Sequence, residues 1–96
     1  MHDYDYDFDE LRPFPGLEVL AYGTANVCYS THKNGVTVDC VRAIWLDPTY
    51  AGEDLRKLER NSELFKAIER VLMDKYSGHI EENIKNMLRN YIGRQA

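Results

Sequence analysis

The sequence predicts an α+β domain, in which a small antiparallel sheet is followed by two or three helices packed on one of its faces. Three observations lead to this fold class. Apolar and polar residues alternate at the start of the chain, which is the period of a β-strand. Lys-Asn-Gly at residues 33–35 is typical of a hairpin turn. From residue 53 onward, apolar residues recur three, four or seven positions apart, as on one face of a helix.

Length and composition favour a single folded domain over residues 1–96, because 44% of the residues are hydrophobic. The two cysteines are too few for the disulfide scaffold of a small secreted domain. The N-terminal residues lack the apolar segment of a secretory signal, and no apolar run is long enough to span a membrane. We therefore expect a soluble cytoplasmic protein with reduced thiols.

Residues 1–16 form an acidic and aromatic arm that we expect to be an N-terminal edge strand of the sheet. Aspartates alternate with aromatic residues in HDYDYDFDE, so the carboxylates lie on one face of the strand and the rings on the other. Two prolines and Gly16 end this strand. The rings expected to be buried against the helices are Tyr4, Tyr6 and Phe8.

Residues 17–47 are predicted to be a long β-hairpin, with strands over 17–32 and 36–47 and a bulge near Gly23. The turn decides the pairing. A two-residue turn at residues 34–35 places Cys28 opposite Val41, with the two cysteines on opposite faces of the sheet. A three-residue turn at 33–35 instead places Cys28 opposite Cys40, close enough for a disulfide or a shared metal. We expect the two-residue turn, since Asn-Gly is its preferred sequence, and hence two inert thiols.

Residues 53–92 are predicted to be helical. We expect a short helix over 53–60 and a longer one over about 62–76, with Asn61 or Ser62 as a capping residue between them. Ser77 and Gly78 are expected to break the chain before a last helix, which Gly93 ends. The helices would pack their apolar stripes on the sheet.

The motifs of common enzyme and metal sites are missing from the sequence. The D-x-D-x-D pattern that starts at Asp3 resembles the start of a calcium loop, but Phe8 and Phe14 stand where that loop needs Gly and Glu. The cysteines and histidines do not have zinc-ligand spacing. Cys28 and His32 are about 13 Å apart along a strand, too far for a catalytic pair. We therefore expect no enzymatic activity, no metal and no cofactor.

Charge is concentrated at the N-terminus. Residues 1–10 contain five of the sixteen acidic residues and none of the twelve Lys and Arg residues. No basic stripe with interleaved aromatic residues occurs, which argues against direct binding to nucleic acid. Carboxylates on one face of a strand repeat about every 6.6 Å, a spacing suited to a basic surface on another protein. The candidate partner-binding residues are Asp3, Asp5, Asp7, Asp9, Glu10, Tyr4, Tyr6 and Trp45.

Other interpretations of the same residues remain open. Charged edge strands prevent aggregation between sheets, and the aspartates could serve only that purpose. In that case the apolar stripes of the helices could complete the core of a homodimer. Trp45 lies beside Ile and Leu and is more often a core residue than an exposed anchor.

The acidic and aromatic start DYDYDFDE, the single long hairpin and the terminal helices together resemble small accessory proteins of bacteriophages. Some of those proteins, including anti-CRISPR proteins, block host complexes that handle nucleic acids by covering their basic surfaces. The resemblance covers the size and layout of the chain. It implies a non-enzymatic inhibitor that uses an acidic surface to block a basic site on its partner.

Overall fold

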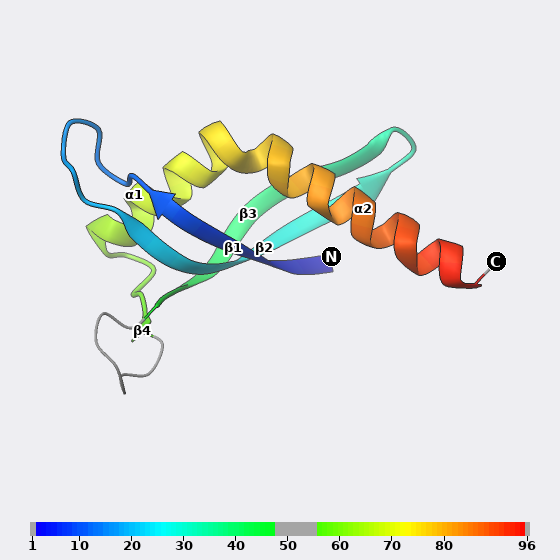
Figure 1. Cartoon of the computed structure of the whole chain (residues 1–96), viewed down its shortest axis with the longest axis horizontal. Helices are drawn as coiled ribbons and strands as arrows, with labels where there is room; N and C mark the ends of the chain where they lie inside the picture. The colour runs from blue at the N-terminus through cyan, green and yellow to red at the C-terminus, as the bar shows by residue number, and fades with distance from the viewer. Residues whose placement is uncertain (1, 48–55, 96) are drawn as a thin grey trace.

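The computed structural model describes residues 2–47 and 56–95. They form an antiparallel sheet with strand order β1-β2-β3-β4, followed by helical structure, which confirms the α+β class (Figure 1). The elements are β1 (His2–Leu11), β2 (Ala21–His32), β3 (Gly35–Leu46), β4 (Arg56–Lys57), α1 (Glu63–Val71), the π-helical segment η1 (Leu72–Tyr76) and α2 (Ser77–Gln95).

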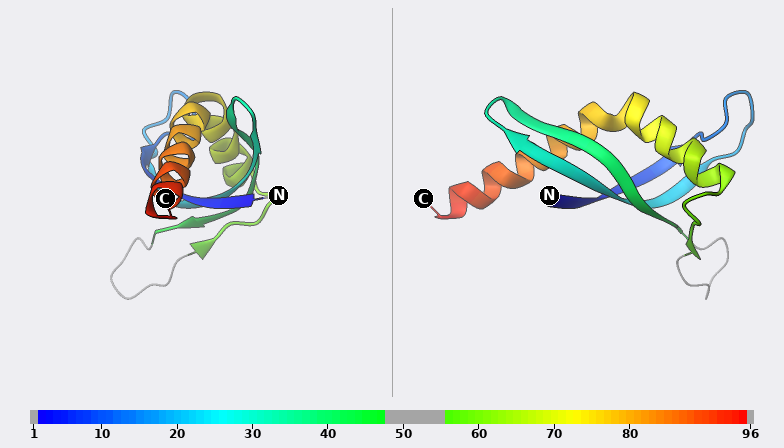
Figure 2. Two further views of the ribbon diagram at one scale, coloured as in Figure 1. Left: turned by 90° about the vertical axis from the view of Figure 1, so that its right-hand side faces the viewer. Right: turned by 180° about the vertical axis from the view of Figure 1, so that it is seen from behind.

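The core lies between the helical structure and one face of the sheet (Figure 2). Alternate residues of β1 point toward the helices, and so do alternate residues in the first half of β2, as the period of two predicts. In β3 shifts of register widen the spacing to three residues in two places, and the buried residues are Val36, Val38, Val41 and Ile44. We call the other side, which the helices do not cover, the open face. The largest fully buried side chains are Phe65, Leu11, Ile44, Ile68, Leu72, Ile80, Ile84, Val27 and Val41.

The N-terminal arm is the predicted edge strand. β1 pairs with β2 and buries Tyr6 and Phe8 in the core, while Tyr4 is half-buried. The Tyr6 hydroxyl is hydrogen-bonded to Nδ1 of His79 at 2.7 Å, so β1 is tied directly to α2. Burial of aromatic area therefore fixes the orientation of the whole strand, with its aspartates on the open face.

The bulge predicted near Gly23 lies instead in the strand opposite. The register between β1 and β2 shifts between Phe8 and Leu11, and Glu10 there has a positive φ of 50°. Gly23 serves a different purpose, because a Cβ atom at this position would clash with the carbonyl oxygen of Trp45. The glycine lets the backbones of β2 and β3 approach closely.

The hairpin turn differs from the prediction by one residue. His32 pairs with Gly35, so the turn residues are Lys33 and Asn34 rather than Asn34 and Gly35. The physical reason is the conformation of Gly35, which has a φ of 143° and uses its conformational freedom directly after the turn. The first strand of the hairpin, β2, begins at Ala21 and not at residue 17 as predicted.

The predicted pairing of Cys28 with Val41 is wrong. Cys28 is the partner of Cys40, because the register shifts between Cys28 and Tyr29 and leaves Asp39 as an additional residue in β3. A second shift follows Asn26 along the same pair of strands. The bulge at Asp39 therefore brings the cysteines together, although the turn has two residues.

The prediction of a short helix over 53–60 is wrong for residues 56–60, which are not helical. Residues 53–55 lie outside the described ranges. Arg56 and Lys57 form β4, which pairs with the end of β3. Leu58 follows as a buried residue, and its backbone N–H donates to the carbonyl of Ile44 at 2.9 Å. The unpaired edge of β3 thus holds this segment in an extended conformation.

One continuous helical rod replaces the two or three predicted helices, because α1, η1 and α2 follow one another without interruption. Ser77 keeps right-handed helical angles, φ −57° and ψ −41°, at the expected break. Leu72 and Ile80, on either side, are fully buried against the sheet. Their burial outweighs the cost of about 1 kcal/mol for a helical glycine. At the far end, α2 continues past Gly93 to Gln95.

The predicted cap is present at the start of the rod. Ser62 precedes α1, and its hydroxyl oxygen accepts a hydrogen bond from the backbone N–H of Phe65 at 3.1 Å. Farther along, a carboxylate oxygen of Glu81 accepts from the backbone N–H of Val38 at 3.0 Å. The rod is therefore fixed to two strands of the sheet, by His79 to β1 and by Glu81 to β3.

Candidate functional site

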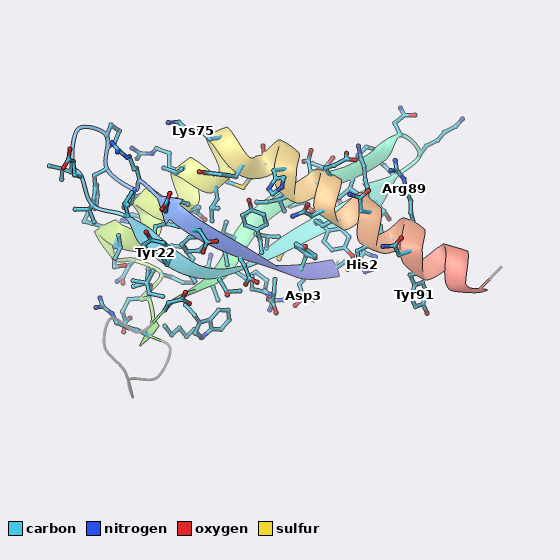
Figure 3. All side chains as sticks on the ribbon, in the orientation of Figure 1. His2, Asp3, Tyr22, Lys75, Arg89 and Tyr91 are labelled. Carbon is cyan, nitrogen blue, oxygen red and sulfur yellow. The ribbon has the colours of Figure 1, made fainter. Side chains whose placement is uncertain are left out.

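Three aspartates of β1 form an exposed row on the open face. We call Asp3, Asp5 and Asp7 the acidic row. They alternate with the residues that β1 directs into the core, so all three side chains point away from the helices. Asp3 lies near the N-terminal end of β1 in Figure 3. At the rise of a strand, neighbouring carboxylates of the row are separated by about 6.6 Å.

Two polar side chains of β2 hold the acidic row in place. Asn26 pairs with Asp5 and donates through Nδ2 to Asp5 Oδ1 at 2.8 Å and to Asp3 Oδ2 at 3.3 Å. Thr24 pairs with Asp7, and its hydroxyl donates to Asp7 Oδ1 at 2.7 Å. Each carboxylate of the row thus accepts a hydrogen bond from the neighbouring strand, which restricts its rotamers.

Basic and aromatic side chains lie on the other half of the open face. Arg42 Nη1 is 4.0 Å from Asp3 Oδ2, with both side chains more than half exposed, so this ion pair contributes little to stability. Lys57 of β4 holds its ammonium 5.8 Å from the centroid of the Trp45 ring. Asp3, Arg42, Trp45 and Lys57 help to line a shallow hollow of about 400 Å³. The open face therefore changes from acidic at β1 to basic at β3 and β4.

The other predicted site residues are placed differently. Asp9 and Glu10 are exposed, but they lie within the bulge of β1 and outside the regular pairing that orders the row. Tyr6 is only 5% exposed and belongs to the core. Trp45 is half-buried, intermediate between a core residue and a free anchor. Of the predicted residues, the open face brings together the acidic row and Trp45.

Tyr6 is the aromatic residue whose chemistry the fold changes. Burial, and then the nearby phenols of Tyr76 and Tyr4, raise its pKa above the ordinary value of 10. The Tyr6 ring lies edge-on to His79, with ring centroids 5.6 Å apart. This residue therefore stabilises the contact between β1 and α2 and is not available to a partner.

Sequence reasoning did not identify Thr24 and Asn26. Both are ordinary polar residues at alternate positions of β2, which is the pattern of any exposed strand face. Only the register of β1 against β2 shows that they face Asp7 and Asp5. β1 and β2 are not joined by a tight turn, so the sequence alone does not determine their register.

Over residues 2–47 and 56–95, no three side chains among His, Cys, Asp and Glu gather in a way that could hold a metal ion. In the same ranges, none of the helical segments combines the length and apolar character needed to cross a lipid bilayer.

Family models, curated proteins and solved structures were each compared with the chain, and none matched. The resemblance to bacteriophage accessory proteins therefore stays a prediction.

Proposed function

We propose that this chain is a non-enzymatic protein-binding module that docks its acidic row onto a basic surface of another protein. The observation that carries the proposal is the cross-strand hydrogen bonding of Asp3, Asp5 and Asp7 by Asn26 and Thr24. A carboxylate that is already positioned loses less conformational entropy on binding. An exposed row of like charges also steers a basic partner during diffusion.

The spacing of the row is compatible with a surface that normally holds a nucleic-acid backbone. The row repeats a negative charge about every 6.6 Å, and one strand of duplex DNA carries one per roughly 3.4 Å. At about half that density, the row is a modest imitation of phosphates. We propose that the partner's basic site is blocked by this row, which is the mode of inhibition that the resemblance to bacteriophage accessory proteins implies.

Edge protection is a weaker explanation of the same aspartates. A charge that only prevents aggregation needs exposure, and it does not need a fixed rotamer. The row aspartates have hydrogen-bond donors from β2, and Asn26 serves two of them. Holding like charges in register costs stability, which a basic partner would offset.

Affinity capture from a nuclease-treated lysate of the native host tests the proposal. The chain is compared with the triple variant D3N/D5N/D7N and with E18Q/D74N/E82Q, which removes three exposed carboxylates elsewhere. Both variants change the net charge equally. We expect a partner that the wild type and the control variant retain and the row variant loses. Equal capture by all three chains, or equal loss from both variants, would overturn the proposal.

Self-association is a second candidate, favoured by exposed apolar side chains on α2. The stripe that buries Ile80 and Ile84 continues to Met87 and Tyr91, which are 40% and 62% exposed. This last part of α2 extends beyond the sheet, as Figures 1 and 2 show. A second copy packed on these residues would cover them. Light scattering distinguishes the candidates: a wild-type dimer that M87S/Y91S converts to monomers supports self-association, and a monomeric wild type removes it.

A further inference from the structure

Cys28 and Cys40 face each other directly across β2 and β3. Facing residues of an antiparallel pair have Cα atoms about 4.5–5.5 Å apart. A disulfide joins cysteines whose Cα atoms lie about 4.4–6.8 Å apart. Both residues are free thiols in the structure. The register therefore allows a bond between the two sulfur atoms without any rearrangement of the strands.

The two thiols differ in accessibility. Cys28 is 3% exposed, and burial followed by the adjacent Cys40 thiol raises its pKa. Cys40 is half-buried and lines a surface hollow of about 460 Å³ beside α1. Lys66 and Arg70 line the same hollow together with Asp39 and Glu69, so its basic and acidic residues are equal in number. Because Cys28 is buried, Cys40 is the thiol that a small reagent in the solvent meets first.

We propose that Cys28 and Cys40 form a dithiol redox site that closes into a cross-strand disulfide by reaction with a low-molecular-weight disulfide. The Cys40 thiolate attacks one sulfur of that reagent, and the first small thiol leaves with a proton. The Cys28 thiolate then attacks the Cys40 sulfur of the mixed disulfide and releases the second small thiol. The two protein thiols are oxidised, and one small disulfide is reduced to two thiols.

Closure of this site acts directly on the open face. A bond between β2 and β3 fixes the register at Cys28, two residues from Asn26, which orders Asp3 and Asp5. Arg42 lies two residues beyond Cys40 on the other strand. The inference that Cys28 and Cys40 can form a disulfide depends on the strand register and is independent of the proposed partner.

Incubation of the native chain with oxidised glutathione tests the proposal, with intact mass and peptide mapping as the readout. We expect the wild type to lose two hydrogen atoms, to retain no glutathione, and to yield one peptide linked through Cys28 and Cys40. The C28S variant should instead retain one glutathionyl group on Cys40. The C40S variant should react much more slowly, because its remaining thiol is buried.

A register control completes the experiment. In T37C/C40S the two thiols sit diagonally, since Thr37 faces Ser30, and their Cα atoms are about 8 Å apart by strand geometry. This variant should carry glutathione and form no intrachain bond. The proposal is overturned if the wild type keeps glutathione or forms only interchain dimers. It is also overturned if the native thiols stay free while the chain unfolded in urea is oxidised.

Discussion

Replacement of Gly23 by alanine should destabilise the fold strongly, because this glycine lies where β2 and β3 approach most closely. A Cβ atom at position 23 would clash with the carbonyl oxygen of Trp45 and would lie 3.0 Å from the Cα of Leu46. Both are backbone atoms of the neighbouring strand, so no side-chain rotation can relieve the contact. The strands must separate instead.

The expected magnitude follows from that separation. Overpacking costs about 1–3 kcal/mol, and each ladder hydrogen bond that lengthens costs about 1 kcal/mol. The bond from the Asp47 N–H to the Tyr22 carbonyl, 2.9 Å long, is adjacent to the clash. A loss of about 3 kcal/mol is a large part of the stability of a small domain. It corresponds to a decrease in Tm of about 12–24 °C for a chain of this size.

Gly78 provides a matched control for the same substitution. A Cβ atom there meets nothing within 4 Å, and the residue lies in a helix. Alanine should therefore raise stability by up to about 1 kcal/mol. Urea unfolding followed by circular dichroism measures both variants. A G23A chain as stable as the wild type would refute the pairing of Gly23 with Leu46, and with it the register of the hairpin.

Three further predictions concern the cap, the core and the acidic row. S62A should lower the free energy of unfolding by about 1 kcal/mol, because the Phe65 N–H loses its acceptor; an unchanged urea midpoint would contradict the cap. Y6F should cost about 1 kcal/mol through the lost bond to His79. Because the pKa of Tyr6 is raised in the folded chain, this phenol ionises at a lower pH in the unfolded chain, and wild-type stability should fall as the pH rises above 10. Urea titrations at several pH values should show a less steep fall for Y6F. N26A keeps every charge of the acidic row but removes two of its hydrogen bonds, so partner affinity should decrease while its dependence on salt stays the same, as titration at several salt concentrations would show.

The sequence predicted the parts of the fold that depend on local periodicity. Alternation placed the rings of β1 in the core and its aspartates on the open face. The helical period predicted an apolar stripe facing the sheet, and Phe65, Ile68 and Leu72 of the rod are buried there. Ser62 was recognisable as a cap because its side chain acts on its own helix.

The features of the fold that the sequence did not predict depend on pairing between strands and on packing against the sheet. The bulge at Asp39 depends on how β3 pairs with β2, and β4 exists because it pairs with the end of β3, so neither feature follows from a local period. The helix continues through Gly78 because residues on both sides are buried by the sheet. For the candidate site, the charges of the row were predictable, whereas the contacts from Asn26 required the register of two separate strands.

The most direct measurement compares D5N with D9N against the captured partner, by titration calorimetry at low and physiological salt. Each variant removes one exposed carboxylate from the same strand, but Asp5 is ordered by Asn26 and Asp9 lies in the bulge. We expect D5N to weaken binding about fivefold, the effect of roughly 1 kcal/mol, and D9N to have a smaller effect. Equal effects of the two variants would contradict the claim that the ordered row, rather than the charge of the arm, is the docking surface.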